Sequence, residues 1–221
     1  MPVREFSDDA VDPKVHGFVH LPDNPNGDGF VLTHGAGSSA AAPLLVALAE
    51  MLSANGFTVL RCDLPYRQFK SFGPPGPGDG ARDRAGLKNA LAALKKMAPG
   101  RLFLGGHSYG GRQSSMLCAE DPALASALLL LSYPLHPPRK PEQQRTQHLP
   151  DLRTPTLFVQ GTRDPFGSIA EMERALKMIP ATTKLMVVEG VGHDLGFKGK
   201  ARNEEPLATV LVELQKLEVG S

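Results

Sequence analysis

A short apolar run that leads into a serine between two glycines constrains this chain most. The run Leu102–Leu104 is followed by Gly106-His107-Ser108-Tyr109-Gly110, and a helix-compatible segment extends from Arg112 to Ala119. This order predicts a strand, a sharp turn and a helix, with Ser108 on the turn as an exposed nucleophile. Gly106 and Gly110 then have to lack a Cβ, so that strand and helix can approach closely. From this pentapeptide alone, a glycine-rich turn with a solvated serine is the alternative.

A second glycine loop follows another apolar run. Phe30–Leu32 leads into Thr33-His34-Gly35-Ala36-Gly37. A reaction that develops negative charge on an oxygen needs two aimed N–H donors, and the amides of Tyr109 and Ala36 are our candidates for this oxyanion hole. A phosphate-binding turn is the alternative, but the Gly-Lys-Ser/Thr that such a turn needs does not follow.

Two later apolar runs end in residues with complementary chemistry. Residues 156–160 lead into a turn that ends at Asp164, and residues 184–188 lead into a glycine loop that ends at His193. We interpret His193 as the general base that takes the Ser108 proton, and Asp164 as the carboxylate that orients the imidazole. The alternatives are an Asp-Pro turn in which Arg163 pairs with the carboxylate, and an inert loop histidine.

Strand-like and helix-like segments alternate along the chain. The apolar runs are continuous, which is typical of parallel strands covered on both faces. We therefore predict one α/β domain over residues 1–221, with a mostly parallel sheet of about seven or eight strands and helices on both faces. The expected strands are 15–20, 29–33, 57–61, 101–106, 127–132, 156–160 and 184–188, with a weaker edge strand near 3–6. The expected helices follow Pro43, surround Leu87–Leu94, follow Ser108, follow a Ser168/Glu171 capping box and begin at Pro206.

These motifs together resemble the α/β-hydrolase superfamily over nearly the whole chain. The resemblance lies in 34–37, 61–66, 106–112, 132–138 and 160–167. More narrowly, the chain resembles small, lidless, dienelactone-hydrolase-like proteins, a branch that includes the hydrolase-like domain of an animal chromatin-complex subunit. The order Ser108, Asp164, His193 is the order expected for this fold. The chain has serine where dienelactone hydrolases proper have cysteine, so their substrate does not carry over.

The resemblance and the residues together predict a serine hydrolase. We expect a carboxylesterase that cleaves small soluble esters or thioesters through an acyl-enzyme intermediate. The alternatives are a non-catalytic binding or scaffold protein of the same fold, and an acyltransferase that uses the same serine. Side chains or backbone expected to contact the substrate belong to His34, Gly35, His107, Tyr133 and Phe166.

Two loops are expected to shape the site. Residues 134–153 stand where many relatives insert a helical cap, but about twenty proline-punctuated residues cannot build one, so the site should be open. Residues 73–80 are too rich in glycine and proline for regular structure, and form either a flap or a spacer. Arg139, Lys140 and Arg145 either favour an anionic substrate or form a solvated basic loop.

Composition narrows the choice of partners. The chain has 24 Lys and Arg against 23 Asp and Glu, a net charge of +1, which gives no electrostatic footprint for nucleic acid. The longest apolar run is far too short to span a bilayer, and the first residues do not resemble a signal peptide, so we expect a cytoplasmic protein. No histidine or cysteine spacing resembles a closed zinc site. We therefore expect no metal and no cofactor, and the sequence leaves the oligomeric state open.

Overall fold

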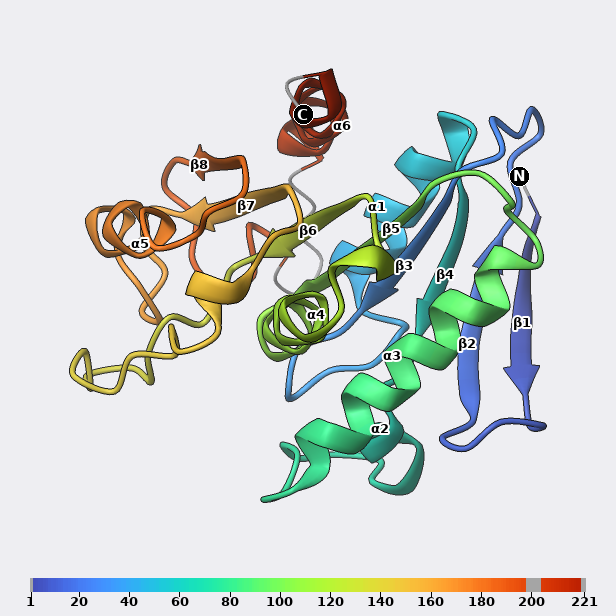
Figure 1. Cartoon of the computed structure of the whole chain (residues 1–221), viewed down its shortest axis with the longest axis horizontal. Helices are drawn as coiled ribbons and strands as arrows, with labels where there is room; N and C mark the ends of the chain where they lie inside the picture. Colours follow the sequence, from blue (N-terminus) through green and yellow to red (C-terminus); the bar gives the residue numbers. More distant parts are fainter. Residues whose placement is uncertain (1, 198–203, 220–221) are drawn as a thin grey trace.

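The computed structural model describes residues 2–197 and 204–219, and eight of its strands form one twisted sheet (Figure 1). The strand order is β1-β2-β4-β3-β5-β6-β7-β8. β1 and β2 run antiparallel to their neighbours, and the other six strands, β3 to β8, are parallel to one another. The strands are β1 (Val3–Asp8), β2 (Val15–His20), β3 (Gly29–Thr33), β4 (Thr58–Cys62), β5 (Leu102–His107), β6 (Ala127–Leu131), β7 (Thr156–Gly161) and β8 (Thr183–Val188).

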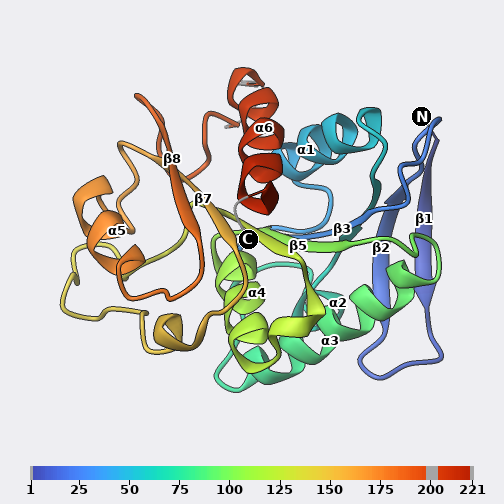
Figure 2. The ribbon, with the colours of Figure 1, turned by 45° about the horizontal axis from the view of Figure 1, so that its top comes forward.

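Helices cover both faces of the sheet, as continuous apolar strands require. Every residue of β3, β4, β6 and β7 is buried. Figure 2 shows α1 and α6 on one side of the sheet and α3 and α4 on the other. The helices are α1 (Pro43–Ala54), α2 (Pro65–Phe69), α3 (Asp79–Lys95), α4 (Tyr109–Glu120), α5 (Ile169–Leu176) and α6 (Glu205–Val219). The predicted α/β class, with no separate cap domain, is confirmed.

The core is divided into two apolar clusters by the sheet. The cluster on one face joins the strands to leucines of α3 and α4 and to Met172 and Leu176 of α5. The cluster on the other face joins them to α1 and α6, with Leu48 and Leu52 from α1 and Val210 and Leu214 from α6. These leucine stripes are core, as their helical spacing predicts.

The largest departure from expectation lies in residues 73–80. We expected no regular structure there, but α3 already begins at Asp79 and includes Gly80. The Asp79 carboxylate accepts a hydrogen bond from the Gly76 amide at 2.6 Å, and Gly78 takes a φ of 92°, so the turn closes tightly enough to start the helix. The expectation of irregular structure was therefore wrong for 79 and 80 and correct for 73–78.

Residues 134–153 form an extended loop, and its only regular piece is a single 3₁₀ turn at Leu149–Asp151. A capping box begins α5, where the Ser168 amide donates to Glu171 at 2.9 Å. No helix in the described part of the chain is long and apolar enough to cross a membrane.

Candidate active site

Ser108 occupies a strained turn between β5 and α4. Its φ of 52° and ψ of −117° lie outside the regions that a serine normally adopts. A Cβ added to Gly106 would lie 2.7 Å from the Gly111 nitrogen, and one added to Gly110 would lie 2.5 Å from the His34 oxygen. Both glycines are therefore needed for the close approach of strand and helix, as the sequence predicts. The close packing of β5 against α4 imposes this strained conformation on Ser108, which lies at the end of β5 and at the beginning of α4.

Ser108, His193 and Asp164 form one chain of hydrogen bonds. The distance from His193 Nε2 to Ser108 Oγ is 2.8 Å, and that from His193 Nδ1 to Asp164 Oδ2 is also 2.8 Å. A carboxylate only accepts hydrogen bonds, so Nδ1 carries the proton and Nε2 is left to accept from the Ser108 hydroxyl. The other carboxylate oxygen of Asp164 accepts from the Phe166 amide at 2.9 Å. The geometry thus gives the imidazole the tautomer that a general base needs.

The end of β7 and the loop after β8 bring Asp164 and His193 together. The Arg163 amide donates to the Val191 carbonyl at 2.9 Å, and the Gly190 amide donates to the Thr162 hydroxyl at 2.9 Å. A Cβ on Gly161 would lie 2.5 Å from the Val191 oxygen, so these two segments meet only because residue 161 has no side chain.

The His107 side chain is hydrogen-bonded to the backbone of His193. Its Nε2 lies 2.7 Å from the His193 carbonyl oxygen, so it must carry a proton and donate. Burial, with a smaller contribution from the nearby His193, lowers the pKa of His107 to about 4, which keeps the ring neutral at ordinary pH. Measured between centroids, the Phe166 ring lies 4.2 Å from the His193 ring and the His107 ring lies 5.0 Å from it. His193 thus packs against two rings.

The proposed oxyanion donors lie on well-anchored backbone. Tyr109 is the first residue of α4, where an amide has no intrahelical acceptor. The Ala36 carbonyl accepts from the Tyr66 hydroxyl at 2.8 Å and from Arg67 Nη2 at 3.0 Å. Two side chains of α2 therefore fix the Ala36–Gly37 peptide, which adjoins the peptide that carries the Ala36 amide.

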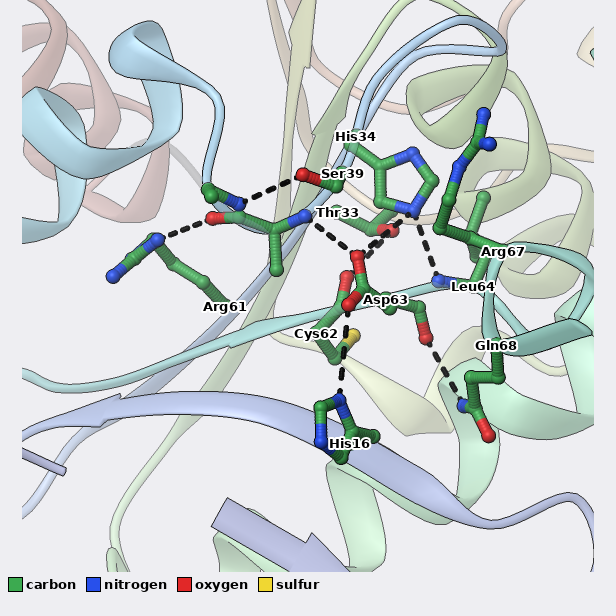
Figure 3. A network of polar contacts seen from close by, with 12 residues as sticks. His16, Thr33, His34, Ser39, Arg61, Cys62, Asp63, Leu64, Arg67 and Gln68 are labelled. Carbon is green, nitrogen blue, oxygen red and sulfur yellow. Dashed lines mark hydrogen bonds and ion pairs between the residues drawn. The ribbon is translucent and has the colours of Figure 1, made fainter. Parts of the chain in front are cut away.

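Asp63, at the end of β4, anchors the rest of this loop (Figure 3). Its carboxylate accepts from the Ala40 amide at 2.7 Å. The nearby His34 ring donates from Nδ1 to the Gly35 carbonyl at 2.9 Å and accepts at Nε2 from the Leu64 amide at 3.1 Å. Burial lowers the pKa of His34, in keeping with the neutral ring that these two bonds require. The His34 side chain is 0% exposed and supports the loop from within, and its contact with substrate stays a prediction.

A pocket of about 540 Å³ opens beside Ser108. Its wall includes Ala36 and Tyr109, the aromatic ring of Phe166, the prolines of the 74–77 segment and two arginines, Arg112 and Arg145. A smaller pocket of about 160 Å³ lies next to it and is lined by His34, Gly35, His107 and Phe197. The larger pocket is the one that reaches the Ser108 hydroxyl.

The residues expected to contact substrate therefore fall into three groups. Phe166 lines the pocket that contains Ser108, while Gly35 and His107 line the smaller one. Tyr133 is only 1% exposed, and its hydroxyl donates to the Arg145 carbonyl at 2.7 Å. Its ring packs against Phe158 in the core, and the contact of Tyr133 with substrate stays a prediction.

Comparisons with known proteins agree with this geometry. The sequence model of a family described as an alpha/beta hydrolase domain matches residues 27–216. The chain belongs to this α/β-hydrolase family. Among curated proteins, the polyketide synthase ThaQ of Burkholderia thailandensis is 38% identical over 76 residues, which make up 34% of this chain and 4% of that protein. The chain thus spans only a small part of the length of that relative.

Solved structures share the fold of this α/β hydrolase. Dienelactone hydrolase from Anabaena variabilis is 23% identical, with a TM-score of 0.71 over 96% of this chain and 95% of that chain. An α/β serine hydrolase without a lid from Xanthomonas campestris is 19% identical, with a TM-score of 0.73 over 97% and 93%. Est1E from Butyrivibrio proteoclasticus is 16% identical, with a TM-score of 0.72 over 99% of both chains. The expected superfamily and lidless, dienelactone-hydrolase-like fold are confirmed; the link to the chromatin subunit stays a prediction.

Sequence reasoning missed several residues that shape the site of this α/β hydrolase. Asp63, Tyr66 and Arg112 fall within segments of the family resemblance without a role of their own, and Arg67 lies outside those segments. The available signal was position, because polar residues directly after β4 lie beside the loop that follows its parallel neighbour β3. In the described part of the chain, no cluster of three or more His, Cys, Asp or Glu side chains could hold a metal ion.

Proposed function

We propose that this α/β hydrolase is a serine carboxylesterase that cleaves small esters or thioesters. The observation that carries the proposal is the unbroken hydrogen-bonded chain Ser108–His193–Asp164, with 2.8 Å at each step. In this mechanism His193 removes the Ser108 proton while Oγ forms a bond to the substrate carbonyl carbon. The proton then passes to the leaving alcohol or thiol as its bond to that carbon breaks, and an acyl-enzyme is left.

Water completes the cycle by the same route in reverse. His193 takes a proton from water, the resulting hydroxide attacks the acyl carbonyl, and Ser108 regains its proton as the acid leaves. In this proposal the amides of Tyr109 and Ala36 hold the negative oxygen in both steps. Loss of one such donor typically lowers turnover by about 10²- to 10³-fold.

The shape of the site favours small substrates. The pocket beside Ser108 is walled by loops and by the first turns of α4, and neither 73–78 nor 134–153 carries a helical cap. Nothing in the described residues encloses a long acyl chain, so accessible, water-soluble esters suit the site best.

Labelling with a fluorophosphonate probe tests the nucleophile. The folded wild-type chain should be modified at Ser108 alone, as peptide mapping would show, and should hydrolyse p-nitrophenyl acetate. Ser108→Ala should lose both properties and still fold. Ser126→Ala, which changes an exposed serine at the opposite edge of the sheet, should retain both. Folded wild-type protein that is neither labelled nor active would instead support a non-catalytic binding protein of this fold.

A further inference from the structure

The pocket beside Ser108 carries an unbalanced positive charge. Arg112 and Arg145 both contribute to its wall, and no aspartate or glutamate does among the residues that the structure describes. Of the three basic residues noted in the 134–153 loop, only Arg145 reaches this pocket, since Arg139 and Lys140 are exposed. The charge is therefore a property of the pocket and not of the loop as a whole.

Arg112 is placed by the same helix that places Ser108. It lies one turn further along α4, and its amide donates to the Ser108 carbonyl at 3.0 Å. Its side chain is half-buried, and its Nε is buried without a hydrogen-bond partner. A buried N–H without a partner is costly, so this guanidinium is suited to a ligand that accepts hydrogen bonds.

Arg145 is held in place by the segment that follows β6. Its amide donates to the Leu135 carbonyl at 2.8 Å, and its Nη1 donates to the Pro134 carbonyl at 3.2 Å. The Tyr133 hydroxyl donates to its carbonyl at 2.7 Å. Both arginines line the same pocket, and burial, followed by the charge of Arg112, lowers the pKa of the Arg145 guanidinium. Arg145 is thus preorganised at the pocket wall.

Neighbouring carboxylates are engaged elsewhere. Asp83 accepts from the Tyr109 hydroxyl at 2.7 Å and from the Tyr66 amide at 3.1 Å, and Glu120 pairs with Arg84 at 2.9 Å. In the described part of the chain, neither Arg112 nor Arg145 forms an ion pair with a carboxylate. Two partly desolvated cations without a counter-ion favour an anionic ligand, and guanidinium groups match the planar, two-oxygen geometry of a carboxylate.

We propose that the substrate is an ester that carries a separate carboxylate group, which Arg112 and Arg145 bind while Ser108 attacks the ester carbonyl. This inference rests on the proposed esterase function and names its substrate class. The carboxylate takes no part in bond making; it positions the ester and contributes binding energy. It can belong to the acyl part or to the alcohol part of the ester.

Matched substrate pairs test this directly. Mono-p-nitrophenyl adipate is compared with p-nitrophenyl methyl adipate, and 4-acetoxybenzoate with its methyl ester, at low salt and against enzyme-free blanks. The structure predicts that kcat/KM for the anionic member of at least one pair exceeds that for the neutral member by about 10- to 100-fold, the range of hydrogen bonds to charged groups. In Arg112→Gln and in Arg145→Gln this ratio should fall towards one.

Lys140→Gln is the matched control, because it removes one positive charge from the exposed part of the same loop. The ratio should persist in this variant. A ratio near one in the wild type, or an equal fall in Lys140→Gln, would overturn the inference, because either result removes the special role of the pocket arginines. If either result is found and neutral esters are still cleaved through Ser108, the carboxylate-binding inference fails and the proposed esterase function stands.

A binding measurement separates the inference from catalysis. Adipate, titrated into Ser108→Ala by calorimetry, should bind, and the additional change Arg112→Gln should weaken that binding about tenfold or more. Absence of adipate binding would contradict a carboxylate subsite. Tighter binding of inorganic phosphate than of adipate would contradict it as well, because the anionic group would then be a phosphate.

Discussion

Gly161 shows how a single missing side chain controls the geometry of catalysis. Asp164 and His193 are 29 residues apart and lie on different segments, yet their side chains meet at 2.8 Å. The carbonyl of Val191 lies where a Cβ of residue 161 would stand. Any side chain at 161 must push the His193 loop away from the end of β7.

We therefore predict that Gly161→Ala lowers kcat at least tenfold and destabilises the fold by about 1–3 kcal/mol, the usual range for overpacking. Gly192→Ala is the matched control, because a Cβ there would meet only the Arg163 oxygen at 3.8 Å. Ester hydrolysis and urea unfolding measure the two effects. Equal activity of the two variants would contradict the argument.

The sequence predicts Ser108, Asp164 and His193 well because each follows its own apolar run, and ends of parallel strands meet at one edge of a sheet. It does not predict the roles of His34 and Tyr133. Their hydrogen-bond partners are backbone groups of segments distant along the chain, such as the Leu64 amide and the Arg145 carbonyl. Only the assembled fold shows that these side chains support the site from within.

At the scale of elements, the short helix α2 is tied to the loop after β3. Tyr66 and Arg67 both bond the Ala36 carbonyl, and Arg67 also donates to the Gly73 carbonyl at 2.8 Å. The Ala36 carbonyl is thus held by a neighbouring element, while the adjoining Gly35–Ala36 peptide, which carries the proposed oxyanion donor, is held mainly by its own loop through His34 Nδ1 and the Ser38 amide.

Tyr66→Phe should lower kcat about fivefold to tenfold with little change in KM, because one hydrogen bond is worth about 1 kcal/mol and Arg67 retains its own. The rate of fluorophosphonate labelling should fall in parallel, since that reaction develops charge at the same place. Urea unfolding would check that the fold is retained. A changed KM with an unchanged kcat would assign Tyr66 to substrate binding instead.

The boundaries of helices and strands were predictable where the local sequence determines them, and not where a contact in the folded structure determines them. The eight strands were predictable to within a few residues, because buried parallel strands have continuous apolar sequences. The start of α3 was not, because glycine and proline precede it and the Asp79–Gly76 contact that closes the turn depends on three-dimensional placement. The positions of the apolar runs in the sequence likewise do not predict the spatial strand order β2-β4-β3-β5.

Across the whole molecule, full or partial burial keeps four histidines neutral: His20, His34, His107 and His148. Burial is the main cause that lowers the pKa values of His20, His107 and His148 to about 4. In the unfolded chain these groups titrate near pH 6.5. Between pH 6.5 and pH 4 the unfolded chain therefore binds more protons than the folded one, and the free energy of unfolding falls as the pH falls.

Each such histidine contributes a slope of about 1.4 kcal/mol per pH unit in this window. Urea unfolding between pH 7 and pH 4.5 should show the loss of stability. His20→Gln should reduce the slope by about one histidine's share, because a glutamine oxygen can still accept from Arg61 Nε, which now lies 2.8 Å from His20 Nε2. An unchanged slope would show that His20 does not titrate on unfolding.

One helix carries both the reactive hydroxyl and a cation of the pocket. Ser108 is the N-cap of α4 and Arg112 lies four positions further along the chain, which corresponds to a rise of about 6 Å along the helix axis. The helix backbone fixes this rise between the residue that carries the hydroxyl and the residue that carries the guanidinium. Replacing the surrounding loops would therefore change the shape of the pocket and leave this rise unchanged. A substrate with a longer spacing between its ester and its carboxylate would require an arginine one turn further along α4.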